Sequence, residues 1–343
     1  MPVKILPVEV KQIIDSYWFY SDFYSIISRV DSKKMWFINN YINLFDIPDP
    51  NQLYTFFYNG YYRDKMVEFY DCPFIEFQRL AIDRTSSTIL NNDLFDFIKA
   101  SIDGGYYVIV MIERFYIKEY EFSLKSPHEV MINGYDDVNK KLYFCDNNAN
   151  GKYSTNITCD YEAFSRAFHL LEIEAHDFKQ HLYLLKPLEN NNYTFSLKYV
   201  KNTMKAYLLS RAHTDEYYNE ALGTPGLTFG INVYDKASDY LKYLAQEEVV
   251  FDIRSFHLLY DHKKCMTMRL DYMINNKHLL DDNQILNRWR KLEADVLAVR
   301  NSILKYWLTR SPEALYKQVE QLQKLKETEM VLLREVVEQL EER

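Results

Sequence analysis

One stretch in the first half of the chain constrains the fold more than any other, because it has the pattern of two strands joined by a tight polar turn. Val130 and Ile132 lie among polar neighbours, residues 136–141 (Asp-Asp-Val-Asn-Lys-Lys) have turn chemistry, and residues 142–144 resume an extended apolar run. This pattern predicts a β-hairpin. A hairpin brings its first and last residues side by side, so we expect His128 and Asp146 to meet at one end of a sheet.

A histidine beside a carboxylate has two interpretations. In a Cys-His-Asp or Ser-His-Asp site the imidazole is the base and the carboxylate holds its tautomer and orientation. The same two residue types also flank hairpins as a purely structural pair. The spacing of His128 and Asp146 is compatible with both interpretations.

Composition limits the class of protein. The 343 residues suggest two domains of ordinary size, and 48% apolar with 26% charged residues excludes a disordered chain. The chain has only 8 glycines and no Gly-rich phosphate loop. Its net charge of −8 offers no basic face for nucleic acid or for an anionic membrane. We therefore expect neither as a partner.

The four cysteines, Cys72, Cys145, Cys159 and Cys265, are scattered without a Cys-x-x-Cys motif, so neither a zinc knuckle nor a disulfide framework is indicated. The N-terminal residues 1–7 lack the apolar core of a signal peptide. No apolar run approaches the length that spans a bilayer. We expect a cytoplasmic protein with no cofactor or metal of its own.

The periodicity of apolar residues predicts a mixed first half. We expect a buried helix over residues 8–30, an aromatic element over 33–45, a helix over 94–102 capped by residues 91–93, and a helix over 161–168. Strands are predicted over 106–112, 153–158 and 181–187, the first of them central and buried. Between residues 52 and 82 the pattern is ambiguous, with a short helix near Leu53 and strands near residues 67–77.

The second half changes character after Glu189-Asn190-Asn191-Asn192, which is the best linker candidate. Helices are predicted over 196–210, 232–247, 252–276, 282–308 and 312–342. The last has a heptad-like apolar stripe that suits either a coiled-coil seam or packing on its own domain. The fold class is therefore α+β, with an antiparallel-sheet domain over residues 1–188 and an all-helical domain over residues 193–343.

The order of these elements is that of a papain-like fold, in which the histidine opens one strand and the Asp or Asn ends the next. Residues 104–110, 128–136 and 144–147 resemble the N-terminal domain of the butirosin biosynthesis protein H family and its papain-like relatives. Residues 229–235, 252–257 and 262–264 resemble the helical part of the same group. These proteins occur in antibiotic biosynthesis clusters of Gram-positive bacteria.

The resemblance implies acyl transfer in bacterial secondary metabolism of the nonribosomal-peptide or polyketide type. An acyl or peptidyl carrier protein would present a thioester, and a small-molecule amine would accept the acyl group as an amide, or an alcohol as an ester. Phosphopantetheine would be present only on the carrier. His128 would be the base and Asp146 the orienting carboxylate, as in transglutaminase-like relatives.

The chain departs from the family where the nucleophile should be, because no cysteine precedes Cys72. Three alignments of the first helix place Ser16, Ser21 or Trp18 at that position. Ser21 is expected to be exposed because Asp22 follows it. Cys72 is the one cysteine that could substitute, but its aromatic surroundings favour a packing role.

Two further hypotheses need no nucleophile. His128 could deprotonate the incoming amine as it attacks the carrier thioester directly, or the chain could be a non-catalytic relative that binds a carrier protein or product.

In the helical half, His257, Asp261 and His262 lack clean metal-ligand spacing. Arg254, Lys263 and Lys264 could contact the phosphate or the acidic helix of a carrier.

Overall fold

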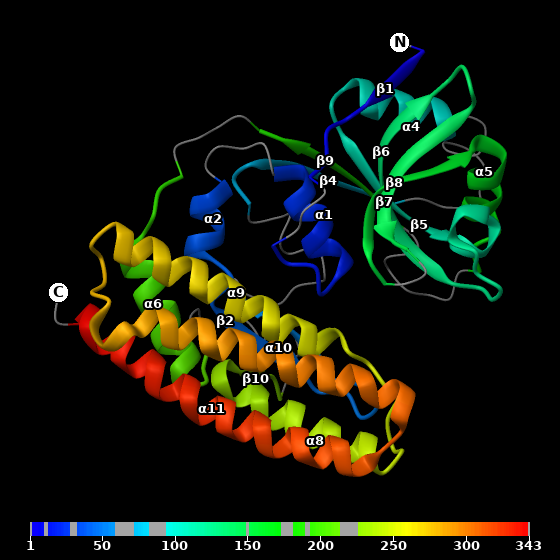
Figure 1. Ribbon diagram of the computed structural model, residues 1–343. Helices are drawn as coiled ribbons and strands as arrows, with labels where there is room; N and C mark the ends of the chain where they lie inside the picture. Colours follow the sequence, from blue (N-terminus) through cyan, green and yellow to red (C-terminus); the bar gives the residue numbers. More distant parts are fainter. Residues whose placement is uncertain are drawn as a thin grey trace. The chain divides into compact units, whose positions relative to one another are not determined.

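The computed structural model describes residues 2–9, 13–27, 33–58, 72–81, 94–148, 151–172, 181–188, 193–212 and 226–341 (Figure 1). The predicted cap at 91–93 and the predicted linker at 189–192 lie outside the described residues. The chain forms two compact units. The first unit comprises residues 1–12, 18–31 and 65–191, and the second unit comprises residues 13–17, 32–64 and 192–343.

The first unit contains a seven-stranded antiparallel sheet. The strand order is β4-β9-β5-β6-β7-β8, and β1 pairs with β6. The strands are β1 (Val3–Ile5), β4 (Ile75–Ala81), β5 (Tyr107–Glu113), β6 (Pro127–Asp136), β7 (Lys141–Asn147), β8 (Tyr153–Asp160) and β9 (His181–Pro187). The predicted hairpin is confirmed as β6 and β7, and the predicted buried strand as β5. The strand over 181–187 does not close the sheet, because β9 lies between β4 and β5.

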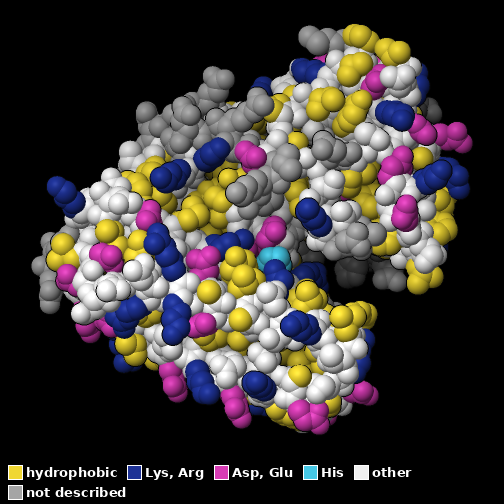
Figure 2. Space-filling model, in the orientation of Figure 1, with side chains coloured by type: hydrophobic (Ala, Val, Ile, Leu, Met, Phe, Trp, Pro, Cys, Tyr) yellow, Lys and Arg dark blue, Asp and Glu magenta, His cyan; other side chains and the backbone are white. Residues whose placement is uncertain are grey.

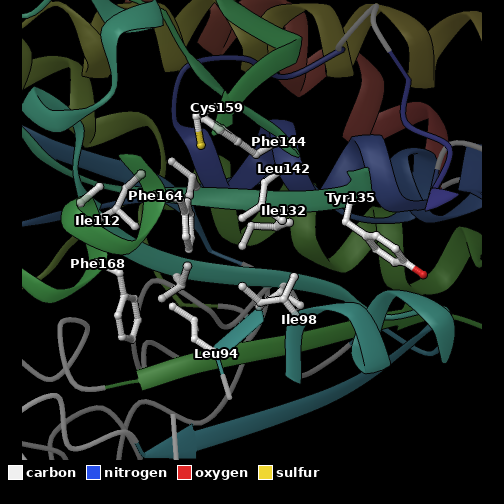
Figure 3. Close-up of a cluster of buried hydrophobic side chains, with 14 of the residues drawn as sticks. Leu94, Ile98, Ile112, Ile132, Tyr135, Leu142, Phe144, Cys159, Phe164 and Phe168 are labelled. Atoms are coloured by element: carbon white, nitrogen blue, oxygen red, sulfur yellow. The ribbon is translucent and has the colours of Figure 1, made fainter. Parts of the chain in front are cut away.

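The core of the first unit lies between one face of this sheet and two helices, α4 (Leu94–Asp103) and α5 (Tyr161–His169). Figure 3 shows Leu94 and Ile98 of α4 with Ile132 and Leu142 of the hairpin in this cluster. Alternate residues along each strand supply the cluster because side chains alternate between the two faces of a sheet. The helices predicted over 94–102 and 161–168 are confirmed.

Helix α1 (Trp18–Ile27) packs against β7 and β9. Cys145 points to the opposite face of β7 from Phe144, and burial raises the pKa of its thiol well above the usual range. The prediction of one helix over residues 8–30 is wrong in its extent, because residues 13–17 are not helical. The backbone N–H groups of Asp15 and Ser16 instead donate hydrogen bonds to the Asp261 carboxylate, at 3.1 and 3.0 Å.

The second unit is mostly helical, as expected. Its helices are α2 (Lys33–Asn39), α6 (Leu197–Leu208), α8 (Val233–Ala245), α9 (Arg254–Asn275), α10 (Ile285–Thr309) and α11 (Pro312–Glu341). The apolar stripe of α11 packs against α8 and α10 of its own unit (Figure 1).

The second unit is not all-helical, which corrects the prediction for residues 193–343. Strand β10 (Thr228–Phe229) pairs with β2 (Asn43–Ile47), which pairs with β3 (Tyr54–Tyr58). This pairing draws residues 32–64 into the second unit, whereas a boundary at residue 188 assigned them to the first. The short helix expected near Leu53 is also wrong, because aromatic and β-branched residues over 54–58 favour a strand.

The core of the second unit contains a buried ion pair. Lys263 of α9 and Glu329 of α11 are both fully buried, and the Lys263 Nζ lies 2.5 Å from the Glu329 carboxylate. The hydroxyls of Tyr207 and Tyr234 donate hydrogen bonds to the same carboxylate at 3.1 and 2.8 Å. The pair therefore links α6, α8, α9 and α11 through one carboxylate.

No helix among the described residues is both long enough and apolar enough to cross a membrane. Figure 2 shows acidic and basic side chains interspersed over the visible helices, and the described residues drawn on that face form no continuous basic surface.

Removing one member of the first-unit core tests the packing. Phe164 is fully buried on α5. Phe164→Ala is expected to lower the free energy of local opening by about 3–5 kcal/mol, because the lost contacts leave a cavity. Native-state hydrogen exchange of peptides spanning 127–147 measures this, and Val138→Ala, which is 68% exposed, serves as the control. Equal protection in the two variants would contradict the packing.

Breaking the buried pair tests the second unit. Glu329→Gln is expected to destabilise the unit by about 3–5 kcal/mol, because it leaves the Lys263 ammonium buried without a counter-charge. Replacing both residues in Lys263→Met/Glu329→Met should recover most of that loss. Hydrogen exchange along α11 measures both variants, and a double variant at least as unstable as Glu329→Gln would contradict the interpretation.

Candidate active site

The candidate site is centred on Asp146, near the end of β7, whose side chain is fully buried. Four donors surround its carboxylate. The Tyr120 hydroxyl donates to Oδ2 at 2.5 Å, and Arg114 Nη1 lies 3.4 Å from the same oxygen. The Asn147 backbone N–H donates to Oδ1 at 2.6 Å, and His128 Nδ1 lies 2.9 Å from Oδ1. These four donors replace the solvent around a carboxylate that is fully buried.

The pairing expected from the hairpin is therefore present. The register of β6 and β7 sets Met131 opposite Cys145 and Ile132 opposite Phe144. His128 and Asp146 lie just beyond the Met131–Cys145 pair, at the same end of the hairpin.

The surroundings of His128 fix its tautomer. Its Nδ1 lies 2.9 Å from Asp146 Oδ1 and 2.8 Å from the backbone oxygen of Glu129. Both neighbours are acceptors, so Nδ1 carries the proton and donates it. In the neutral imidazole Nε2 then keeps its lone pair, and no described residue forms a hydrogen bond with it. The side chain is 22% exposed, so this lone pair belongs to a group that solvent can reach.

The pKa of His128 reflects two opposing effects. Burial alone would lower it, but the charge and the hydrogen bond of Asp146, with the Glu129 charge, outweigh burial and raise the pKa above the usual 6.5. The raised pKa makes Nε2 a stronger base than the nitrogen of a free imidazole, which favours a role as general base.

Sequence reasoning missed Arg114 and Tyr120, which hold Asp146. Both lie on short 3₁₀ helices directly after β5, η1 (Arg114–Tyr116) and η2 (Lys118–Tyr120). The Arg114 guanidinium lies over the Tyr120 ring, 5.3 Å from its centroid, and donates to the Ser126 hydroxyl at 2.7 Å. A basic residue directly after a buried strand was a signal, but its partner lies 32 residues further along the chain.

Of the three residues considered for the nucleophile position, the structure brings Trp18 to His128. Trp18 is the first residue of α1, and its ring meets the imidazole edge-on with centroids 6.4 Å apart. It is 8% exposed. The helix is held to the sheet by Tyr153 of β8, whose hydroxyl donates to Asp22 Oδ1 at 2.6 Å. Burial raises the pKa of Asp22 well above its usual range.

Neither serine hydroxyl has a hydrogen-bond partner among the described residues. Ser21 is fully buried in α1, so the expectation that it is exposed is wrong. It faces inward because it lies one helical turn from Trp18, on a helix with almost no polar face. Ser16 is 6% exposed and belongs to the second unit. Cys72 is also buried, as its expected packing role requires.

The second unit holds a group of three possible metal ligands among the described residues, Asp15, His257 and Asp261, with ligating atoms within 4.8 Å of one another. His257 Nε2 lies 2.9 Å from Asp15 Oδ1. The Lys264 ammonium lies 2.6 Å from Asp261 Oδ1, and so already supplies a positive charge there. The group is therefore an ion-pair network rather than an evident metal site.

The charged residues expected to contact a carrier protein are engaged within the chain. Lys263 is fully buried against Glu329, which makes that expectation wrong for Lys263. Arg254 is paired with Asp252.

Comparison with known proteins adds no assignment: no protein-family model matches the chain, and neither does any curated protein.

Removing the charge of Asp146 tests the electrostatic account. In Asp146→Asn, burial acts on His128 without the opposing carboxylate, so its pKa should fall below 6.5. An NMR titration of the histidine rings measures this. Asp136→Asn, which removes a turn carboxylate at the other end of β6, is the control and should leave the His128 pKa in place. A raised His128 pKa in Asp146→Asn would contradict the account.

Proposed function

We propose that the chain is an acyltransferase that moves an acyl group from a carrier-protein thioester directly to a small-molecule amine, with His128 as general base. The Nε2 lone pair takes a proton from the amine as its nitrogen attacks the thioester carbonyl. The C–N bond forms, the C–S bond breaks, and the imidazolium returns the proton to the departing phosphopantetheine thiolate. The reaction balances without a covalent enzyme intermediate.

The observation that carries this proposal is the arrangement around His128. Its Nδ1–H is held between two acceptors, so Nε2 is left as the basic nitrogen. The carboxylate behind it is fully buried and bonded by Tyr120 and Arg114, which favours a fixed imidazole orientation. Direct transfer to the amine is also compatible with a tryptophan, Trp18, at the start of α1, because this route requires no nucleophile there.

A second function has its own supporting observation. Trp18 lies against the imidazole at 8% exposure, and a side chain of that size could fill the space that a substrate needs. A chain that kept His128, but in which Trp18 stops a substrate from reaching it, would bind a carrier protein or a product without turnover. Such a non-catalytic relative would act as an interaction protein in the same biosynthetic pathway.

The proposal predicts which substitutions stop the reaction. His128→Gln is expected to lower kcat/KM by about 100-fold or more, because general-base catalysis contributes at least that much. Ser16→Ala and Ser21→Ala should leave the rate within about threefold, because neither hydroxyl takes part. Mass spectrometry of an acyl-loaded carrier protein mixed with candidate amines measures product formation. His169→Gln, which changes another imidazole of the first unit, is the control.

The pH profile gives a second readout. The rate should fall as the pH drops through the raised pKa of His128, because protonation removes the basic lone pair. A Ser16→Ala or Ser21→Ala variant that loses activity would contradict direct transfer. Carrier binding without turnover by wild type, with turnover appearing in Trp18→Ala, would favour the non-catalytic relative.

A further inference from the structure

The second unit contains a pocket that shares no lining residue with the His128 site. Its volume is about 510 Å³, within the range of small-molecule sites. The strand β2, the segment after it and helix α8 supply most of the lining, which includes Asp46, Asp49, Leu53, Lys236, Asp239 and Tyr243.

Asp46 is the unusual member of this lining, because its carboxylate is buried without a cationic partner. It is 4% exposed. The Thr55 hydroxyl donates to its Oδ2 at 3.3 Å, but no basic side chain among the described residues forms an ion pair with it. Burial raises the pKa of Asp46 to about 6, partly offset by the Thr55 hydrogen bond and the charge of Lys236. A buried carboxylate that lacks a counter-charge is costly, and a bound cation would remove that cost.

The remaining lining has the complementary properties. Asp49 and Asp239 add negative charge, and among the described residues Lys236 is the single basic side chain that lines the pocket. Asp239 already pairs with Lys242 at 2.8 Å, so it is less available to a ligand than Asp46. Leu53 is a buried apolar member of the lining, and Tyr243 is half-exposed. Such a lining suits a ligand with one positive charge and an apolar body.

We propose that this pocket binds a small organic cation, a primary ammonium joined to an aromatic or aliphatic body. The ammonium forms an ion pair with Asp46, and the apolar body packs on Leu53 and the face of Tyr243. The inference goes beyond the proposed acyl transfer and does not rest on it, because its evidence comes from the second unit alone.

Three matched probes test the pocket by isothermal titration calorimetry on the full chain. Phenethylamine has a positively charged ammonium on a phenylethyl group. 2-Phenylethanol has the same phenylethyl group with a neutral hydroxyl, and phenylacetate has a negatively charged carboxylate. Phenethylamine is expected to bind, with the alcohol weaker by about tenfold or more and no binding by the acid.

Two substitutions on the lining should change the affinity for phenethylamine in opposite directions. Asp46→Asn keeps the shape of the side chain and is expected to weaken binding by about 30-fold, because the ion pair is lost. Lys236→Gln should strengthen it by about threefold, because a competing cation is removed. Asp271→Asn, which removes a carboxylate of α9 outside the pocket, is the control and should change nothing.

Thermal unfolding shows whether each variant is folded. If Asp46→Asn does not fold, Lys236→Gln still tests the proposal. Equal affinity for phenethylamine and 2-phenylethanol would overturn the proposal. So would the absence of saturable binding by phenethylamine in the millimolar range, or unchanged binding in a folded Asp46→Asn variant.

Discussion

The first unit depends on one buried negative charge, the carboxylate of Asp146. Taking an ionised carboxylate out of water is unfavourable unless hydrogen bonds and an opposite charge replace the solvent. Here Tyr120, Arg114 and the Asn147 backbone N–H do so. Tyr120 and Arg114 come from segments that the fold must first bring to β7. The hairpin then adds His128. Asp146, together with Glu129, sets the tautomer of the imidazole and raises its pKa.

The sequence predicted the parts of this site that depend on local pattern. The pattern around Val130 and Ile132 and a polar turn are enough to predict a hairpin, and the hairpin places His128 near Asp146. The position of α1 could not be predicted in the same way. Three alignments were open, and what selects Trp18 is a contact between the Tyr153 hydroxyl and Asp22, more than a hundred residues apart. Arg114 was missed for the same reason.

The second unit shows the same limit more strongly. Its long helices follow from apolar periodicity, and all five predicted helices are present. Strand β2 was not predicted. It pairs with β3, which follows it closely, and with the two-residue strand β10, which lies about 180 residues after β2 in the chain. The fully buried Lys263 was mistaken for a surface cation, because its burial depends on Glu329 of another helix. Long-range polar partners, rather than periodicity, decide these positions.

The most direct test of the account is the intact mass of the protein after it is mixed with an acyl-loaded carrier protein, first without and then with an amine acceptor. Direct transfer by His128 predicts that the protein mass stays unchanged without the amine, and that amide product appears once the amine is added. A mass increase equal to the acyl group, mapped to Ser16, Ser21 or any other side chain, would contradict direct transfer. Failure to form amide with any donor and acceptor pair, while the carrier protein still binds, would contradict the acyltransferase itself.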